Sequence, residues 1–210
     1  MDSVVLKAHA IYRASLRRML CGSPLSDIDE WIATGKPPTL AEVGEILPDS
    51  LASAFTWNYG FSIPCLEAVE AVRKLQAPLV EIGAGSGYWS ALLRAAGVDI
   101  LATDPSIGSH GFVPGTHHDA APLTASDAVQ RYSDRDVLCS WPSKGADWCR
   151  EAVSLIKPGR HFIYLGEPRG GLCASDALFD LLEAEFDLVG QVITPRFERA
   201  RDGLKIFLKR

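Results

Sequence analysis

Residues 79–106, LVEIGAGSGYWSALLRAAGVDILATDPS, place three glycines between an apolar run and an alanine-rich segment, and they end just past an aspartate. The run LVEI is typical of a buried strand, YWSALLRAAG of a helix, and DILATD of a second strand. Glycines between a strand and a helix indicate a turn that a ligand approaches closely. This stretch therefore predicts a strand–turn–helix–strand unit of a parallel sheet, with a ligand at the turn.

The same alternation continues through the second half of the chain. The strand patterns DVLCSW and HFIYLGE flank the helix pattern ADWCREAVSLIKPG, which predicts an α/β domain whose parallel sheet is covered on both faces. FDLVGQVITPRF and GLKIFLKR are joined only by ERARD, which is too short for a crossover, so we expect an antiparallel pair at the end. Residues 105–135 must supply a third strand and helix if this sheet is regular. We expect the domain to span residues 76–210.

The first 75 residues carry helix patterns and no strand pattern. Apolar residues at three- and four-residue spacings between positions 4 and 20 predict an amphipathic helix. The aromatic segment FTWNYGFSIP lies just before the α/β domain. We expect residues 1–75 to form an N-terminal helical extension that acts as a lid, with Trp57 and Tyr59 folding over a bound ligand.

Composition and charge argue against several classes of function. No apolar run approaches the roughly 18 residues that a membrane helix needs, and a net charge of -5 gives no general attraction to nucleic acid. The five cysteines are scattered and form no CxxC pair, which argues against a disulfide framework and a structural zinc site. His110, His117 and His118 lie near one another, but no acidic or cysteine ligands accompany them at metal-binding spacing. We expect a cytoplasmic protein with no metal, no membrane contact and no nucleic-acid partner.

Two classes of ligand use a glycine turn after the first strand of such a sheet. Dinucleotides require GxGxxG, whose third glycine allows close packing of the helix. Here Gly83, Gly85 and Gly87 form GxGxG, and bulky Tyr88 stands where the third glycine belongs. S-adenosylmethionine has no phosphate, and it needs close backbone approach together with carboxylates for its ammonium and ribose groups. The turn EIGAGSG supplies both the glycines and a carboxylate, Glu81.

The stretch EIGAGSG, with Asp104 at the end of the second strand, resembles motif I of the class I S-adenosylmethionine-dependent methyltransferases, E/D-x-G-x-G-x-G. The resemblance implies a Rossmann-like seven-stranded sheet whose last strands form an antiparallel hairpin. It also implies that the turn lies under the methionine portion, Glu81 reaches its ammonium, and Asp104 accepts from both ribose hydroxyls. Asp119 stands where the family often has an acid near the adenine amino group. The cofactor-binding residues expected on this basis are Glu81, Gly83, Ala84, Gly85, Gly87, Asp104, Asp119 and Ser140.

The methyl acceptor is expected at the end of the fourth strand. Many amino-group methyltransferases of this family carry D/N/S-P-P-Y/F/W there, whereas this chain has CSWPS, with Trp141 between Ser140 and Pro142. Glu167, in GEPRGG after the fifth strand, lies at the carboxyl edge of the sheet, where ligands of open α/β folds bind. It could act on an acceptor or simply precede the next helix. We therefore take Glu167, Trp141 and Tyr59 as the candidate catalytic residues.

These observations predict an S-adenosylmethionine-dependent methyltransferase that acts on a small-molecule or peptidic acceptor. The alternatives are an NAD-dependent oxidoreductase and a protein that binds S-adenosylmethionine without catalysis.

Overall fold

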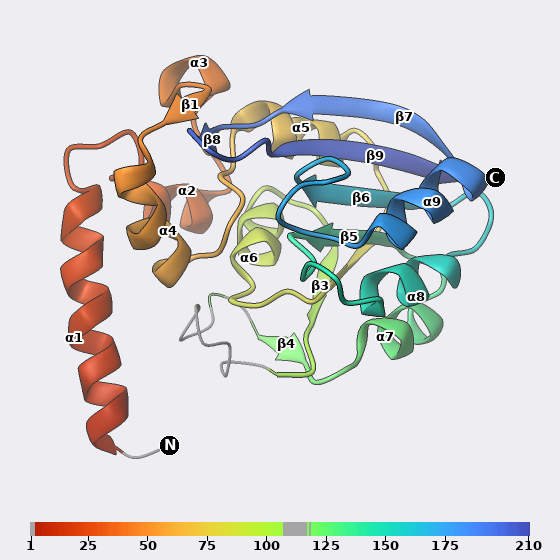
Figure 1. Ribbon diagram of the computed structural model, residues 1–210, viewed down its shortest axis with the longest axis horizontal. Coiled ribbons are helices and arrows are strands. Elements are labelled where there is room, and N and C mark those ends of the chain that lie inside the picture. The colour runs from red at the N-terminus through yellow and green to blue at the C-terminus, as the bar shows by residue number, and fades with distance from the viewer. Residues whose placement is uncertain (1–2, 107–116, 118) are drawn as a thin grey trace.

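The computed structural model describes residues 3–106, 117 and 119–210, and a seven-stranded sheet runs through its centre (Figure 1). The strands are β2 (Leu79–Ile82), β3 (Ile100–Thr103), β4 (Ala120–Ala121), β5 (Asp136–Ser140), β6 (His161–Gly166), β7 (Phe186–Ile193) and β9 (Gly203–Lys209). Their order is β4-β3-β2-β5-β6-β9-β7. The first five in this order are parallel, and β9 is antiparallel to both of its neighbours. The expected fold class, including the antiparallel last pair, is confirmed.

Two hydrophobic clusters cover the two faces of the sheet, because successive strand residues point to opposite faces. On β2, Leu79 packs with α5 (Leu66–Arg73) and α6 (Tyr88–Ala95), whereas Val80 packs with the helices of the other face. Those helices are α7 (Ala125–Arg131), α8 (Trp148–Ser154) and α9 (Asp176–Glu185). Both faces of the central strands are thus buried, as the apolar runs in the sequence predict.

The N-terminal segment contains α1 (Ser3–Leu20), α2 (Ile28–Thr34), α3 (Leu40–Val43), the 3₁₀ helix η1 (Asp49–Leu51) and α4 (Ala52–Asn58). In Figure 1, α1 lies at one end of the molecule, beside α4. Leu20, Ile28 and Phe55 belong to the same core cluster as Leu79 of the sheet. The helices therefore pack onto the α/β domain through a shared core.

The expectation of no strand in the first 75 residues was wrong. The two-residue strand β1 (Ile46–Leu47) pairs in parallel with β8 (Arg196–Phe197). A strand of two residues has no alternation that a sequence pattern could reveal. This small sheet joins the N-terminal helices to the end of the chain.

The third strand and helix expected within 105–135 are β4 and α7. None of the helices in the described parts of the chain is both long and apolar enough to cross a membrane.

Candidate functional site

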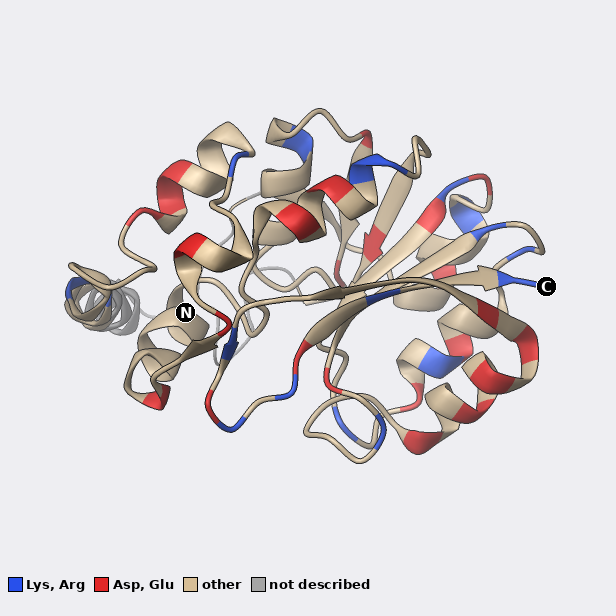
Figure 2. Cartoon of the chain, turned by 90° about the horizontal axis from the view of Figure 1, so that it is seen from above, with Lys and Arg blue, Asp and Glu red and all other residues tan. Residues whose placement is uncertain are grey.

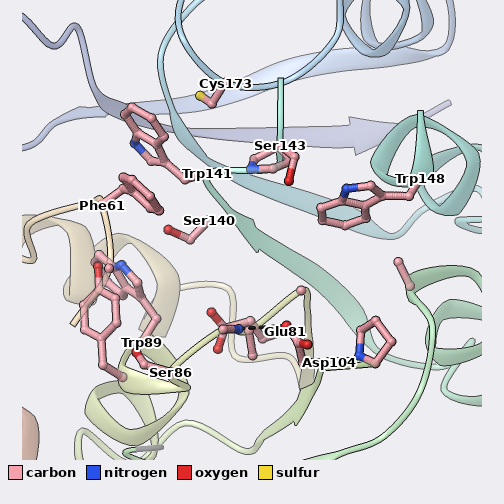
Figure 3. A pocket seen from close by; sticks show the side chains of 18 of the residues that line it. Phe61, Glu81, Ser86, Trp89, Asp104, Ser140, Trp141, Ser143, Trp148 and Cys173 are labelled. Atoms are coloured by element: carbon pink, nitrogen blue, oxygen red, sulfur yellow. Dashed lines mark hydrogen bonds between the residues drawn. The ribbon is translucent and has the colours of Figure 1, made fainter. Parts of the chain in front are cut away.

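A cavity of about 650 Å³ opens at the carboxyl edge of the sheet, where strand order reverses between β2 and β5. Its volume is within the range of pockets that hold small molecules, and such reversal points are the usual ligand sites of open α/β sheets. In Figure 3, the acidic side chains of Glu81 and Asp104 lie along one side of the cavity, and the aromatic side chains of Phe61, Trp141 and Trp148 lie around the rest of it. We call Glu81, Gly83, Gly85 and Asp104 the cofactor end, after the roles that the motif resemblance implies. We call Phe61, Ser140, Trp141, Ser143 and Trp148 the acceptor end, because the sequence leads us to expect the methyl acceptor at Trp141.

The glycine turn forms the floor of the cofactor end. Gly83 and Gly85 have φ angles of 62° and 57°, which side-chain-bearing residues rarely adopt. A Cβ atom at Gly85 would have no neighbour within 4 Å, so it would project into open space, whereas one at Gly83 would meet the Trp148 ring at 2.7 Å. Ala84 also lines the cavity; Gly87 does not, and it caps the start of α6. The turn thus offers an open cradle at Gly85.

Glu81 is buried at the end of β2. Its Oε2 accepts hydrogen bonds from the backbone N and the side-chain Oγ of Ser90, while Oε1 accepts none from the described residues. Burial raises the pKa of Glu81 to about 7, and the nearby Asp104 adds to the rise against the effect of the Ser90 hydrogen bonds. This is a carboxyl group whose ionisation a cationic ligand would favour.

Asp104 follows β3 and is also buried. Its Oδ2 accepts from Gly85 N at 3.0 Å, and its Oδ1 accepts from Ser106 N at 2.7 Å. The carboxylate therefore braces the glycine turn while it lines the cavity. Asp119 is exposed just before β4 and is absent from the described lining, so its expected role at an adenine gains no support.

The acceptor end is aromatic. Trp141 follows β5 and stacks on Phe61 with ring centroids 4.8 Å apart and planes 14° apart. Ser140 also lines the cavity, and its Oγ lies 3.1 Å from Ser62 Oγ. Trp148, at the start of α8, faces these groups across the cavity in Figure 3. These residues form an apolar wall with hydroxyl groups at its base.

Tyr59 lines the cavity, but its hydroxyl points to the N-terminal helices. That hydroxyl donates to Asp29 Oδ1 at 3.0 Å and accepts from Arg17 at 3.3 Å. His117 stacks on the Tyr59 ring with centroids 5.3 Å apart. A shape role for Tyr59 suits this geometry better than proton transfer.

Glu167 does not line the cavity. Its Oε1 accepts from Arg201 N at 2.9 Å, and its Oε2 accepts from Leu172 N, so both oxygens hold loop backbone. Of the two roles left open for Glu167, the structural one fits this geometry, and the catalytic one does not.

Sequence patterns did not single out Trp148 or Phe61 as site residues. Trp148 begins a helix after a parallel strand, a position at the ligand edge of such sheets, and that placement could have identified it. Phe61 has no comparable signal.

His110 and His118 lie outside the described residues, and among the residues described no three His, Cys, Asp or Glu side chains cluster as metal ligands.

No protein-family model and no curated protein matches the chain. Several solved structures are similar at low identity. Magnesium protoporphyrin IX methyltransferase from Synechocystis PCC 6803 is 13% identical, with 69% of this chain and 79% of that chain covered and a TM-score of 0.45. The 1,6-didemethyltoxoflavin-N1-methyltransferase from Burkholderia thailandensis is 16% identical, with 69% and 77% covered and a TM-score of 0.41. Cofactor-bound Rv0187 from MTB is 19% identical, with 76% and 86% covered and a TM-score of 0.45.

At this level of similarity, strand order and direction decide the fold. Five parallel strands, the antiparallel β9 beside β6, the edge strand β7, and the glycine turn after β2 are the features that the motif I resemblance implies. The chain therefore has the seven-stranded Rossmann-like fold of the class I S-adenosylmethionine-dependent methyltransferases.

Proposed function

We propose that the protein is an S-adenosylmethionine-dependent methyltransferase that acts on a small molecule or a short peptide segment. One observation carries the proposal: Glu81, Gly85 and Asp104, which the motif resemblance selects, all line the same cavity, and its far end is an aromatic wall.

The residues at the cofactor end suit S-adenosylmethionine. The Oε1 of Glu81, which accepts no hydrogen bond from the described residues, is a site for the ligand ammonium, and the open space above Gly85 admits close approach of the methionine portion. Asp104 accepts from ribose hydroxyls, because two carboxylate oxygens match a vicinal diol. Each residue thus has a separate part of the ligand to bind.

Bound S-adenosylmethionine would supply an electrophilic methyl group, which passes to an acceptor lone pair while the C–S bonding electrons stay on sulfur. The chain's part is to hold the acceptor in line and to exclude water. Cys173 also lines the cavity, but burial raises the pKa of its thiol to about 11, so near neutral pH it carries its proton and is not a base. Positioning rather than deprotonation is the catalysis that the described residues support.

The dinucleotide alternative fits the same turn less well. Tyr88, at the position of the third glycine, is buried; its ring packs edge-on against Phe55 and its hydroxyl donates to Ser62 O. A bulky side chain fixed here prevents the close helix packing of dinucleotide sites.

Isothermal titration calorimetry with S-adenosylhomocysteine and with NAD tests the proposal. We expect one site for S-adenosylhomocysteine and an affinity for NAD at least about 100-fold weaker, since only the former matches Glu81 and Asp104. Comparable or tighter NAD binding would favour the oxidoreductase. Binding of S-adenosylhomocysteine without methyl transfer from labelled S-adenosylmethionine to any compound of a metabolite extract would favour the non-catalytic alternative.

A further inference from the structure

The orientation of Trp141 is fixed by contacts from distant parts of the chain. Its indole Nε1 donates to Asp202 Oδ1 at 2.8 Å, its backbone N donates to Leu165 O at 2.8 Å, and its ring stacks on Phe61. Its backbone is left-handed, with φ at 51°. A bulky residue persists in that conformation only where its surroundings impose it, and such residues cluster at functional sites.

Asp202 is held in place as well. It is buried in the connection between β8 and β9, next to Arg201, whose backbone N donates to Glu167 Oε1. Burial raises the pKa of Asp202 to about 7, and the neighbouring Glu167 carboxyl adds to the rise, while the Trp141 hydrogen bond and Arg196 oppose it. Burial of two neighbouring carboxyl groups lowers the stability of the folded protein. Their arrangement, however, aims Asp202 at the Trp141 indole.

We propose that Asp202 is a positioning residue that holds the Trp141–Phe61 ring pair as a flat wall, and that this wall selects a planar aromatic methyl acceptor. The inference rests on the proposed function, because it concerns the acceptor end of the same cavity.

The shape of the acceptor end supports this class of acceptor. Trp148 lies across the cavity from the ring pair, and Ser140 and Ser143 lie between them in Figure 3. A flat ring can stack on or meet the edges of these aromatic side chains, which a puckered saturated ring of equal size does less well. The serine hydroxyls can bond to a polar atom on the ring.

Two neutral lactams of the same ring skeleton test the selection. Binding of 2-quinolinone and of decahydro-2-quinolinone is measured by titration calorimetry, with and without saturating S-adenosylhomocysteine. We expect the planar lactam to bind about tenfold more tightly than the saturated one. Trp141→Leu should remove this preference. Trp57→Leu should keep it, because Trp57, which was expected to fold over a ligand, packs on Tyr12 and is absent from the cavity lining. Equal binding of the two lactams, or no binding of either, overturns the selection of a planar acceptor.

A double-mutant cycle tests the part of Asp202. Asp202→Ala should weaken 2-quinolinone binding about fivefold. Asp202→Asn keeps an acceptor for the indole N–H and should stay within about twofold of the wild type. In a Trp141→Phe background, which lacks the indole N–H, Asp202→Ala should not weaken 2-quinolinone binding further. An equal loss in both backgrounds would mean that Asp202 acts through general loop structure and not through the indole.

The outcomes separate this inference from the proposed function. Normal S-adenosylhomocysteine binding by the folded wild type and variants, without discrimination between the lactams, rejects the planar acceptor alone. Absence of S-adenosylhomocysteine binding rejects the proposed function, while the lactam preference measured without it still reports on the wall. Circular dichroism and thermal unfolding establish that each variant is folded.

Discussion

The two ends of the cavity are held by different physical means. At the cofactor end, Asp104 bonds to the backbone of the glycine turn and Glu81 bonds to Ser90, so the site lies within one strand–turn–helix–strand unit. At the acceptor end, Trp141 is held by Asp202 and Phe61, which are 61 and 80 residues away along the chain. The cofactor end is therefore a local structure, and the acceptor end is a product of tertiary packing.

This difference shows where specificity can change without loss of the fold. Asp104 holds the backbone of the glycine turn, so substitutions in this unit should strongly weaken or abolish cofactor binding. The aromatic wall depends on loops at the carboxyl edge of the sheet, and loops tolerate variation better than the elements that they connect. We expect variants of the cofactor end to be inactive and variants of the acceptor end to change acceptor preference.

The largest effect is expected for Gly85→Val. The new side chain would enter the open space above the turn, so S-adenosylhomocysteine binding should be lost in calorimetry. The left-handed backbone adds a cost of about 1–2 kcal/mol in the free energy of unfolding.

Gly159→Val is the matched control for Gly85→Val. Gly159 also has a positive φ and open space around its would-be Cβ, but it lies outside the cavity lining. The control should show the same loss of stability and normal affinity. If the Gly85 variant also binds normally, the turn is not where the ligand approaches.

Asp104→Ala is expected to weaken S-adenosylhomocysteine binding about 100-fold, or about 3 kcal/mol, because charge-assisted hydrogen bonds to the ribose are lost. Calorimetry on the folded variant measures the change. The exposed Asp119 gives the contrast, since its position predicts unchanged affinity for Asp119→Ala. A large loss in the Asp119 variant, with none in the Asp104 variant, would reverse the assignment of the two acids.

The sequence predicts much of the cofactor end but little of the acceptor end, because only the cofactor end is built from residues close together in the chain. Glu81, Gly85 and Asp104 occur at a fixed spacing in one unit, and the alternation of strand and helix patterns places that unit at the edge of a parallel sheet. No local pattern connects Asp202 to Trp141, because that hydrogen bond exists only after β9 has joined the sheet. For Glu167, the strand pattern predicts its place at the sheet edge but not the loop amides that its oxygens bind.

The pH dependence of stability provides a third test of the comparison between the two ends of the cavity. The pKa of Glu81 is raised from 4.5 to about 7 in the folded protein, so folding favours its protonated form. Its contribution to stability is complete below about pH 4.5 and is lost as pH rises through about 7. Glu81→Gln removes this dependence, and its free energy of unfolding relative to the wild type should therefore increase from pH 5 to pH 8, by up to about 3 kcal/mol.

Urea unfolding of the ligand-free proteins at both pH values measures that difference. A constant difference between wild type and variant would mean that Glu81 ionises as easily in the folded protein as in the unfolded one. Binding should show the opposite trend, because the ligand ammonium favours the ionised carboxylate. The affinity of the wild type for S-adenosylhomocysteine should rise from pH 5 to pH 7, with release of a proton.

The smallest effect is expected when the protein is tested for binding to nucleic acid. Two of the basic residues near the end of the chain have acidic partners, since Arg196 pairs with Glu45 and Arg199 with Asp49. In the view of Figure 2, Lys and Arg are interspersed with Asp and Glu along the chain. Binding through phosphates would require unpaired cations and would weaken steeply as salt rises. We therefore expect a filter-binding series with duplex DNA and RNA to show at most weak retention at low salt and none at moderate salt. Tight, salt-sensitive retention that is lost when Arg196, Arg199 and Arg201 are neutralised would instead make the β8–β9 region a docking surface, and the acceptor end would then have to admit a nucleotide base.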